Sequence, residues 1–305
     1  MRRYYIHIFF ALLFVQVACV KKPGEMSGPT IGKLSVVADE SMKDIVEQEE
    51  NIFERDYKYA KLDISYMNEY DMFEKFEADS VDAIMTTRPL TKEETEHFEN
   101  LHRYPRETSF AKGAVAFIAN KNRPDTAYTY EAMLSMFNDA SKGKVFIIEN
   151  AKSGITNYIL QLIHQSKLPD HFYSLGSKKE VMDYLMKHDD AIGIVDWSDL
   201  SDSDSQSAKE ILNSIRLLGT SRPVDSIQHG FIQPFQYNLQ DNIYPFTRDL
   251  YFISKTGMTD VGTGFASFMT GVVGQKIVLK AGLLPKFQSE RILEIRNTSD
   301  IKVIK

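Results

Sequence analysis

Two turns of the sequence place a serine where a strand-like run gives way to a helical pattern. Ser41 precedes the helical pattern of residues 42–54, and Ser153 precedes that of residues 156–165. A serine at a helix start offers a hydroxyl, free backbone N–H groups and the positive end of the helix dipole. Two such turns facing each other across a cleft could trap an anion. Each serine taken alone could instead be an ordinary N-cap.

The sequence holds no signature of a catalytic or metal centre. It lacks Gly-x-Ser-x-Gly, His-Glu-x-x-His, the Walker loop and the dinucleotide fingerprint. The histidines between His97 and His188 have spacings that match no metal site. We therefore expect binding rather than chemistry, with no metal and no cofactor. A secreted hydrolase, whose nucleophile and base would meet only in the folded chain, stays open as an alternative.

The N-terminal residues have the pattern of a targeting signal rather than that of a folded domain. Two arginines precede an apolar run over residues 6–17, which is too short to cross a bilayer because a spanning helix needs roughly 20 apolar residues. The run ends in Val-Ala-Cys, which resembles a bacterial lipobox. We expect residues 1–18 to be a signal peptide, Cys19 to be lipidated and residues 19–30 to be a flexible tether. A general secretory signal with an incidental cysteine is the alternative.

Composition and charge describe an acidic globular protein. The 305 residues include 36 Lys and Arg against 42 Asp and Glu, for a formal net charge of -6. Nucleic acid is not an expected partner, because phosphate contacts need clustered basic residues. The single cysteine excludes a disulfide framework.

Apolar runs and helical patterns alternate along the chain from residue 33. This alternation predicts an α/β fold of mainly parallel sheets with helices on their faces. The predicted strands cover residues 34–38, 62–67, 81–86, 114–119, 145–148, 191–195 and 250–254. The predicted helices cover residues 42–54, 70–78, 130–137, 156–165, 178–187 and 264–281. The stretch 198–209, rich in Ser and Asp, is predicted to be a loop.

The C-terminal part of the chain carries the most specific motifs. The block Ile243–Arg248 is followed by Leu250–Ile253, Gly274–Val278 and Ala281–Pro285. Together with the order of segments over residues 33–286, these motifs resemble the periplasmic phosphate-binding proteins of bacterial ABC transporters. The resemblance implies the two-lobed type II periplasmic binding protein fold, each lobe a mainly parallel sheet flanked by helices.

The resemblance also implies a division of the chain and a role. Residues 31–114 and 240–305 would form lobe I, and residues 115–239 lobe II, with crossings near Gly113 and within residues 230–245. The protein would be a monomeric lipoprotein of the cell envelope, anchored at the periplasmic or extracellular face of a membrane. It would bind phosphate or another small anion in the cleft between the lobes and deliver it to an ABC permease.

Three turns of the chain match the places where this family keeps its ligand contacts. The ligand-binding residues that the resemblance implies are Ser41, Met42, Thr87, Arg88, Ser153, Gly154 and Thr156. The arginine of this set could bind an acidic ligand, or it could pair with Glu149 across the cleft.

The chain departs from the family pattern at several of these turns. Glu149 stands where the family has an arginine, Ile155 replaces a threonine, and the turn Asn68-Glu69-Tyr70 is bulkier and more acidic than the family's Gly-Ser. A carboxylate repels phosphate unless one of the two is protonated. The alternative function is therefore a sensor or assembly lipoprotein with the same fold, whose degenerate pocket binds a protein partner.

Overall fold

The computed structural model describes residues 27–140, 143–223 and 230–287. The predicted signal peptide and the predicted lipidation site Cys19 lie outside the described residues, so both stay predictions. Within the described ranges, no helix combines the length and the apolar character that a bilayer span requires.

Five strands build the first half of the molecule. They are β1 (Ile31–Asp39), β2 (Tyr59–Met67), β3 (Ala83–Thr86), β11 (Thr247–Ser254) and the beginning of β4 (Arg106–Asn120). Their order is β2-β1-β3-β11-β4. β1 runs parallel to both of its neighbours, whereas β11 runs antiparallel to both of its own. The sheet is therefore mainly parallel, as predicted, and the returning strand β11 is the one antiparallel strand in its middle.

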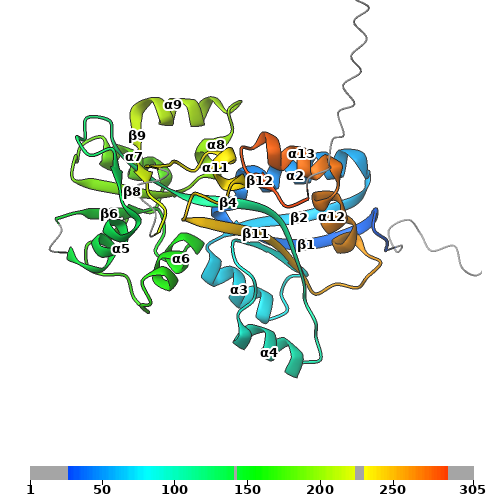
Figure 1. Cartoon of the computed structure of the whole chain (residues 1–305). Helices are drawn as coiled ribbons and strands as arrows, with labels where there is room; N and C mark the ends of the chain where they lie inside the picture. The colour runs from blue at the N-terminus through cyan, green and yellow to red at the C-terminus, as the bar shows by residue number, and fades with distance from the viewer. Residues whose placement is uncertain (1–26, 141–142, 224–229, 288–305) are drawn as a thin grey trace, which may run out of the picture.

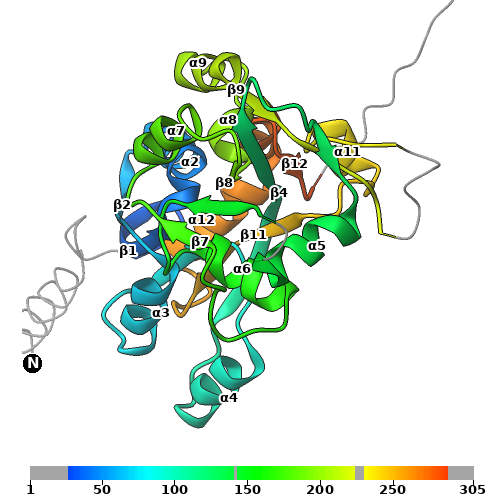
Figure 2. The same cartoon turned by 90° about the vertical axis from the view of Figure 1, so that its left-hand side faces the viewer.

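Helices cover both faces of this half-sheet (Figure 1). One face carries α2 (Lys43–Asp56), α12 (Val261–Thr270) and α13 (Val272–Lys280), and the other carries α3 (Glu69–Glu77) and α4 (Lys92–Asn100). Side chains alternate along β1, so that Leu34 and Val36 pack in the hydrophobic core under α2 and α12, whereas Val37 packs in the core under α3 and α4. Both views show α4 projecting away from the body of the molecule (Figures 1 and 2).

The second half is a smaller sheet with its own helices. Its strands are β6 (Val145–Ile148), β7 (Phe172–Ser174), β8 (Ala191–Asp196) and β9 (Ile215–Leu217). Its helices are α5 (Tyr130–Asn138), α6 (Gly154–Leu162), α7 (Lys178–Leu185), α8 (Ser198–Ser201) and α9 (Gln206–Ser214). The short elements of the chain are η2 (Glu40–Met42), β5 (Ala127–Tyr128), β10 (Gly219–Thr220), α11 (Gln236–Gln240) and β12 (Leu284–Pro285).

The long strand β4 joins the two halves. Its residues 106–114 pair with β11, and its residues 115–120 pair with β8 and β9. The strand order continues as β4-β8-β6-β7. The partner of β4 thus changes at the point where the sequence predicts the first crossing between lobes, and the lobe boundaries themselves stay a prediction.

Every predicted strand has a counterpart in the structure, and so does every predicted helix before residue 264. The predicted loop over residues 198–209 is wrong. This stretch contains α8 and the beginning of α9. Leu200 and Ala208 are buried, and the Ser205 side chain caps α9 by accepting from the Ala208 N–H. The serines and aspartates that suggested a loop instead occupy helix ends and exposed helix positions.

The single helix predicted over residues 264–281 is also wrong. Two helices, α12 and α13, meet at Gly271, whose backbone is extended. The two helices pack so tightly that a Cβ on Gly274 would lie 2.5 Å from the Phe268 carbonyl oxygen. The break therefore lets the two helices fold back against each other, and glycine permits that close approach.

Candidate functional site

The first turn of α6 lies at the junction of the two halves. Ser153 is its N-cap, because its Oγ accepts from the Thr156 N–H at 3.3 Å. The Thr156 hydroxyl donates to the Asn150 carbonyl oxygen at 3.0 Å. Both predicted hydroxyls are thus engaged inside the turn, which leaves the N–H groups of the first turn as its anion-attracting feature.

Three polar side chains of the first half converge on Gly154, the first residue of α6. A Cβ on Gly154 would lie 2.7 Å from Glu69 Oε2, 2.7 Å from Thr87 Oγ1 and 3.1 Å from Asp39 Oδ2. The three side chains come from the start of α3, the end of β3 and the end of β1. The parallel strands β1 and β3 therefore present their carboxyl ends to the N-terminus of α6, an arrangement that places a ligand in open α/β folds.

Replacing Gly154 with alanine is expected to destabilise the protein by about 1–3 kcal/mol, because the added methyl group would overlap the Glu69 and Thr87 oxygens. Urea unfolding would measure the change. Gly257→Ala is the control, since a Cβ there would find only Asp260 Oδ2 at 3.5 Å. Equal stabilities of the two variants would show that the two halves separate freely at Gly154.

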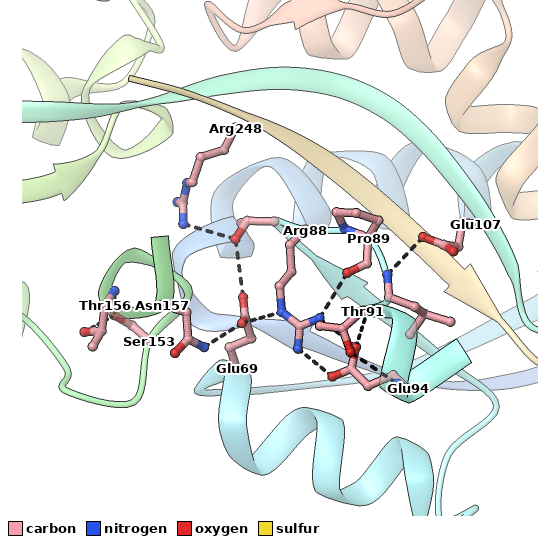
Figure 3. Close-up of polar contacts among 12 residues, drawn as sticks. Glu69, Arg88, Pro89, Thr91, Glu94, Glu107, Ser153, Thr156, Asn157 and Arg248 are labelled. Atoms are coloured by element: carbon pink, nitrogen blue, oxygen red, sulfur yellow. Dashed lines mark hydrogen bonds and ion pairs between the residues drawn. The ribbon is translucent and has the colours of Figure 1, made fainter. Parts of the chain in front are cut away.

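Glu69 bridges the two halves. Its side chain is buried, with the residue 1% exposed. Oε1 accepts from Arg88 Nε at 2.9 Å and from Asn157 Nδ2 of α6 at 2.7 Å (Figure 3). Oε2 lies 3.5 Å from the Thr87 hydroxyl. In the sequence, Glu69 stands out only as an acidic departure in a turn, and no sequence signal points to Asn157 as its partner.

Arg88 serves mainly to join α3 to α4. Its Nη1 and Nη2 donate to both carboxylate oxygens of Glu94 at 2.8 and 2.7 Å, and Nη1 also donates to the Pro89 carbonyl oxygen. Glu94 in turn completes the capping box of α4 with Thr91. The hypothesis that Arg88 pairs with Glu149 is wrong, because the nearer carboxylates Glu69 and Glu94 hold its guanidinium.

Arg248 is the buried cation of the site, and sequence analysis did not assign it to the ligand. It is 5% exposed. Its Nη1 donates to Thr87 Oγ1 at 3.1 Å, its Nη2 pairs with Asp196 at the end of β8, and its Nε has no partner among the described residues. A signal was present in the alternation of β11, which puts Arg248 on the same buried face as Leu250.

Asp39 and Ser41 carry buried polar atoms without partners. Asp39 caps the turn η2, because its Oδ1 accepts from the Ser41 N–H at 2.8 Å. Capping by Ser41 itself is therefore wrong. Asp39 Oδ2 and Ser41 Oγ are buried, and neither has a hydrogen-bond partner in the described part of the chain. Burial raises the pKa of Asp39 from 3.8 to about 6, although the bond from Ser41 opposes this shift.

The predicted site residues are divided between two cavities and the core. Thr87, Arg88 and Gly154 line an open cavity of about 330 Å³ together with Glu69, Asn157 and Arg248. Ser41 and Ser153 line a cavity of about 30 Å³, room for a single water, together with Asp39, Glu149, Asp196 and Lys178. The Met42 side chain packs in the hydrophobic core, and Thr156 is buried. Among the described residues, no cluster of His, Cys, Asp and Glu is arranged to hold a metal ion.

Comparisons with known proteins place this geometry in a family. The family model of the PBP superfamily domain matches residues 23–272. A protein from Clostridium perfringens, described as a phosphate ABC transporter substrate-binding protein and solved with bound phosphate, is similar in structure, with a TM-score of 0.66 and 16% identity over 83% of this chain and 99% of that one. An ABC-type phosphate transport receptor from Vibrio cholerae has a TM-score of 0.63 and 13% identity over 83% of this chain and 99% of that one.

A similar fold also occurs in a protein that is not described as part of a transporter. A Corynebacterium glutamicum OxyR mutant has a TM-score of 0.55 and 12% identity over 91% of this chain and 74% of that one. At such identities the structural likenesses show the fold alone.

No curated protein sequence matches the chain. The family match covers most of the chain, and the sheet with its flanking helices agrees with it. The chain therefore belongs to the PBP superfamily and has the two-lobed fold of the type II periplasmic binding proteins.

Proposed function

We propose that this protein is a lipid-anchored solute-binding protein of the cell envelope, which captures a small protonated oxyanion for an ABC transporter. Phosphate is the first candidate, because the similar protein from Clostridium perfringens was solved with phosphate. The N-terminal sequence with Cys19 supports the lipid anchor. The fold supports binding between the two halves, followed by recognition of the closed form by a permease.

The observation that carries the proposal is a set of buried polar atoms without partners. Arg248 Nε can donate to an anion, and Asp39 Oδ2 can accept a proton from it. The two residues are close enough for their charges to interact. Buried polar groups in proteins are normally hydrogen-bonded, so unpaired ones call for a ligand or ordered water. A phosphate that still carries a proton satisfies both residues, whereas sulfate at neutral pH has no proton to give to Asp39.

We propose that Arg248, Asp39, Thr87 and the N–H of Gly154 make the main ligand contacts. Ser41 and Ser153 belong to the same proposed site through the small cavity. Met42 and Thr156 could contribute only through their backbone groups, because the Met42 side chain is in the core and the Thr156 hydroxyl is bonded to Asn150. Arg88 lines the open cavity and would steer an anion toward it.

Phosphate is expected to raise the thermal midpoint of the full chain, purified without bound solute by unfolding and refolding. A ligand at about 100 times its Kd stabilises the folded state by roughly 2.7 kcal/mol. For a domain of about 150–250 residues, each kcal/mol raises the midpoint by roughly 2–4 °C, which corresponds here to a rise of roughly 5–11 °C. Sulfate at the same ionic strength is the control and is expected to give a much smaller rise. Equal rises with the two anions would contradict a site that selects a protonated oxyanion.

The second candidate is a sensor or assembly lipoprotein that binds a protein partner. Its supporting observation is the acidic character of the junction, where the carboxylates of Asp39, Glu69 and Glu149 line the two cavities. The absence of any thermal response to phosphate, sulfate and molybdate would favour this candidate over solute transport.

A further inference from the structure

The carboxylate of Glu69 occupies the place where α6 would bind an anion. Its Oε2 lies 2.7 Å from the position that a Cβ of Gly154 would take, and its Oε1 accepts from Asn157 Nδ2 in the first turn of the same helix. Helix N-termini attract anions through their free N–H groups and the helix dipole. The chain therefore supplies this helix with an anion of its own.

The surroundings of Glu69 match those of a bound anion. The guanidinium of Arg88 and the carboxamide of Asn157 donate to it (Figure 3). The Thr87 hydroxyl lies 3.5 Å from its other oxygen. The residue is 1% exposed, so water contributes little to its solvation. These donor types are the ones that hold phosphate and carboxylate ligands in binding sites.

A second buried carboxylate makes the junction more acidic. Asp39 Oδ2 has no hydrogen-bond partner and lies 3.1 Å from the same Cβ position on Gly154. An incoming oxyanion thus meets the Asp39 carboxylate, which can accept its proton, and the Glu69 carboxylate, which already accepts hydrogen bonds from Arg88 and Asn157. Like charges in a water-poor site repel strongly, and the repulsion grows with the charge of the ligand.

We propose that Glu69 is a specificity-determining residue, a built-in anion that competes with small oxyanions for the N-terminus of α6 and most strongly excludes fully ionised ones. This inference rests on the proposed solute-binding function. It predicts that the charge of Glu69 lowers the affinity for anions such as sulfate, and it leaves Asp39 and Arg248 to recognise a ligand that still carries a proton.

Isothermal titration of the full chain with inorganic phosphate and with sulfate, at equal ionic strength, tests the inference. The informative variants are Glu69→Gln, which keeps the shape of the side chain without its charge, and Glu69→Ser, which also opens space. Glu74→Gln is the matched control, because Glu74 is an exposed glutamate of the same helix and its replacement makes the same change in net charge. Circular dichroism checks that each variant is folded. Glu69→Gln is expected to fold, since Arg88 keeps its bonds to Glu94.

We expect Glu69→Gln or Glu69→Ser to bind phosphate at least tenfold more tightly than the wild type and the Glu74→Gln control. The gain for sulfate should be larger still, so the preference for phosphate over sulfate should fall. A residue that merely supports the fold would weaken both anions together and leave this ratio unchanged.

The remaining outcomes separate this inference from the proposed function. Unchanged affinities in both Glu69 variants, with phosphate binding by the wild type, would overturn the role of Glu69 and leave oxyanion binding in place. Anion binding by the variants but not by the wild type would support the role of Glu69 and overturn phosphate as the natural solute. No binding of either anion by folded wild type and variants would overturn both.

Discussion

Replacing Arg248 with methionine is expected to lower the free energy of unfolding by about 3–5 kcal/mol, the usual effect of removing one partner from a buried ion pair. Arg248 is 5% exposed and Asp196 is 4% exposed, so neither is solvated well enough to stand alone. Arg248 also donates to the Thr87 hydroxyl at 3.1 Å. Methionine fills much of the same volume. Most of the loss in the free energy of unfolding should therefore come from the buried Asp196 carboxylate, which is left without its ion-pair partner.

Urea unfolding at neutral pH would measure this loss. Arg103→Met is the control, because Arg103 pairs with Asp79 at 2.7 Å while both side chains are at least 40% exposed. Such a surface pair contributes at most about 1 kcal/mol. The double variant with Arg248→Met and Asp196→Asn should be more stable than Arg248→Met alone, because it no longer buries an unpaired carboxylate. An Arg248→Met variant within about 1 kcal/mol of the wild type would mean that water reaches the ion pair.

The local elements of this fold could be predicted from the sequence because they depend on short-range periodicity. Alternation at residues 34–38 and helical spacing at residues 42–54 predict β1 and α2, and the structure contains both. The predicted capping role of Ser153 is also confirmed, since it needs only the three residues that follow. The errors at residues 198–209 and 264–281 arose where tertiary packing decided whether a polar stretch folds and where a helix breaks.

The side-chain partners of the site could not be predicted, because they join distant parts of the chain. The Arg248–Asp196 pair spans 52 residues, and the Glu69–Asn157 bond spans 88 residues. The sequence predicts that Glu149 disfavours phosphate, which stays a prediction. Of the two hypotheses for Arg88, the pair with Glu149 is wrong, because Glu69 and Glu94 hold its guanidinium. The turn containing Glu69 was noted as acidic, yet only the fold shows that this carboxylate lies at the N-terminus of α6.

The stability of the protein is expected to fall as the pH rises from 5 to 8, mainly because of Glu49. This glutamate of α2 is 0% exposed, and both of its carboxylate oxygens lack a hydrogen-bond partner among the described residues. Burial raises its pKa from 4.5 to about 9. The folded state therefore binds the proton more tightly than the unfolded state does. Its stabilising contribution is complete below about pH 4.5 and is lost progressively as the pH rises toward 9.

One such group lowers the free energy of unfolding by about 1.4 kcal/mol per pH unit inside its window. Glu49 alone should then account for about 4 kcal/mol between pH 5 and 8. Asp39, whose pKa is about 6, adds a smaller loss of the same sign that is complete near pH 6. Burial also raises the pKa of Asp199 from 3.8 to about 7, which adds a loss of the same sign up to about pH 7. The pH dependence above pH 7 should therefore belong mainly to Glu49.

Glu49→Gln isolates this contribution, because glutamine keeps the size of the side chain and does not titrate. Urea unfolding at several pH values between 5 and 8 should give a nearly flat profile above pH 7 for this variant, in contrast to the falling profile of the wild type. Glu47→Gln is the control, since it removes the same charge from the same helix at a side chain that is 46% exposed. A profile above pH 7 that falls as steeply in Glu49→Gln as in the wild type would place the titrating group elsewhere.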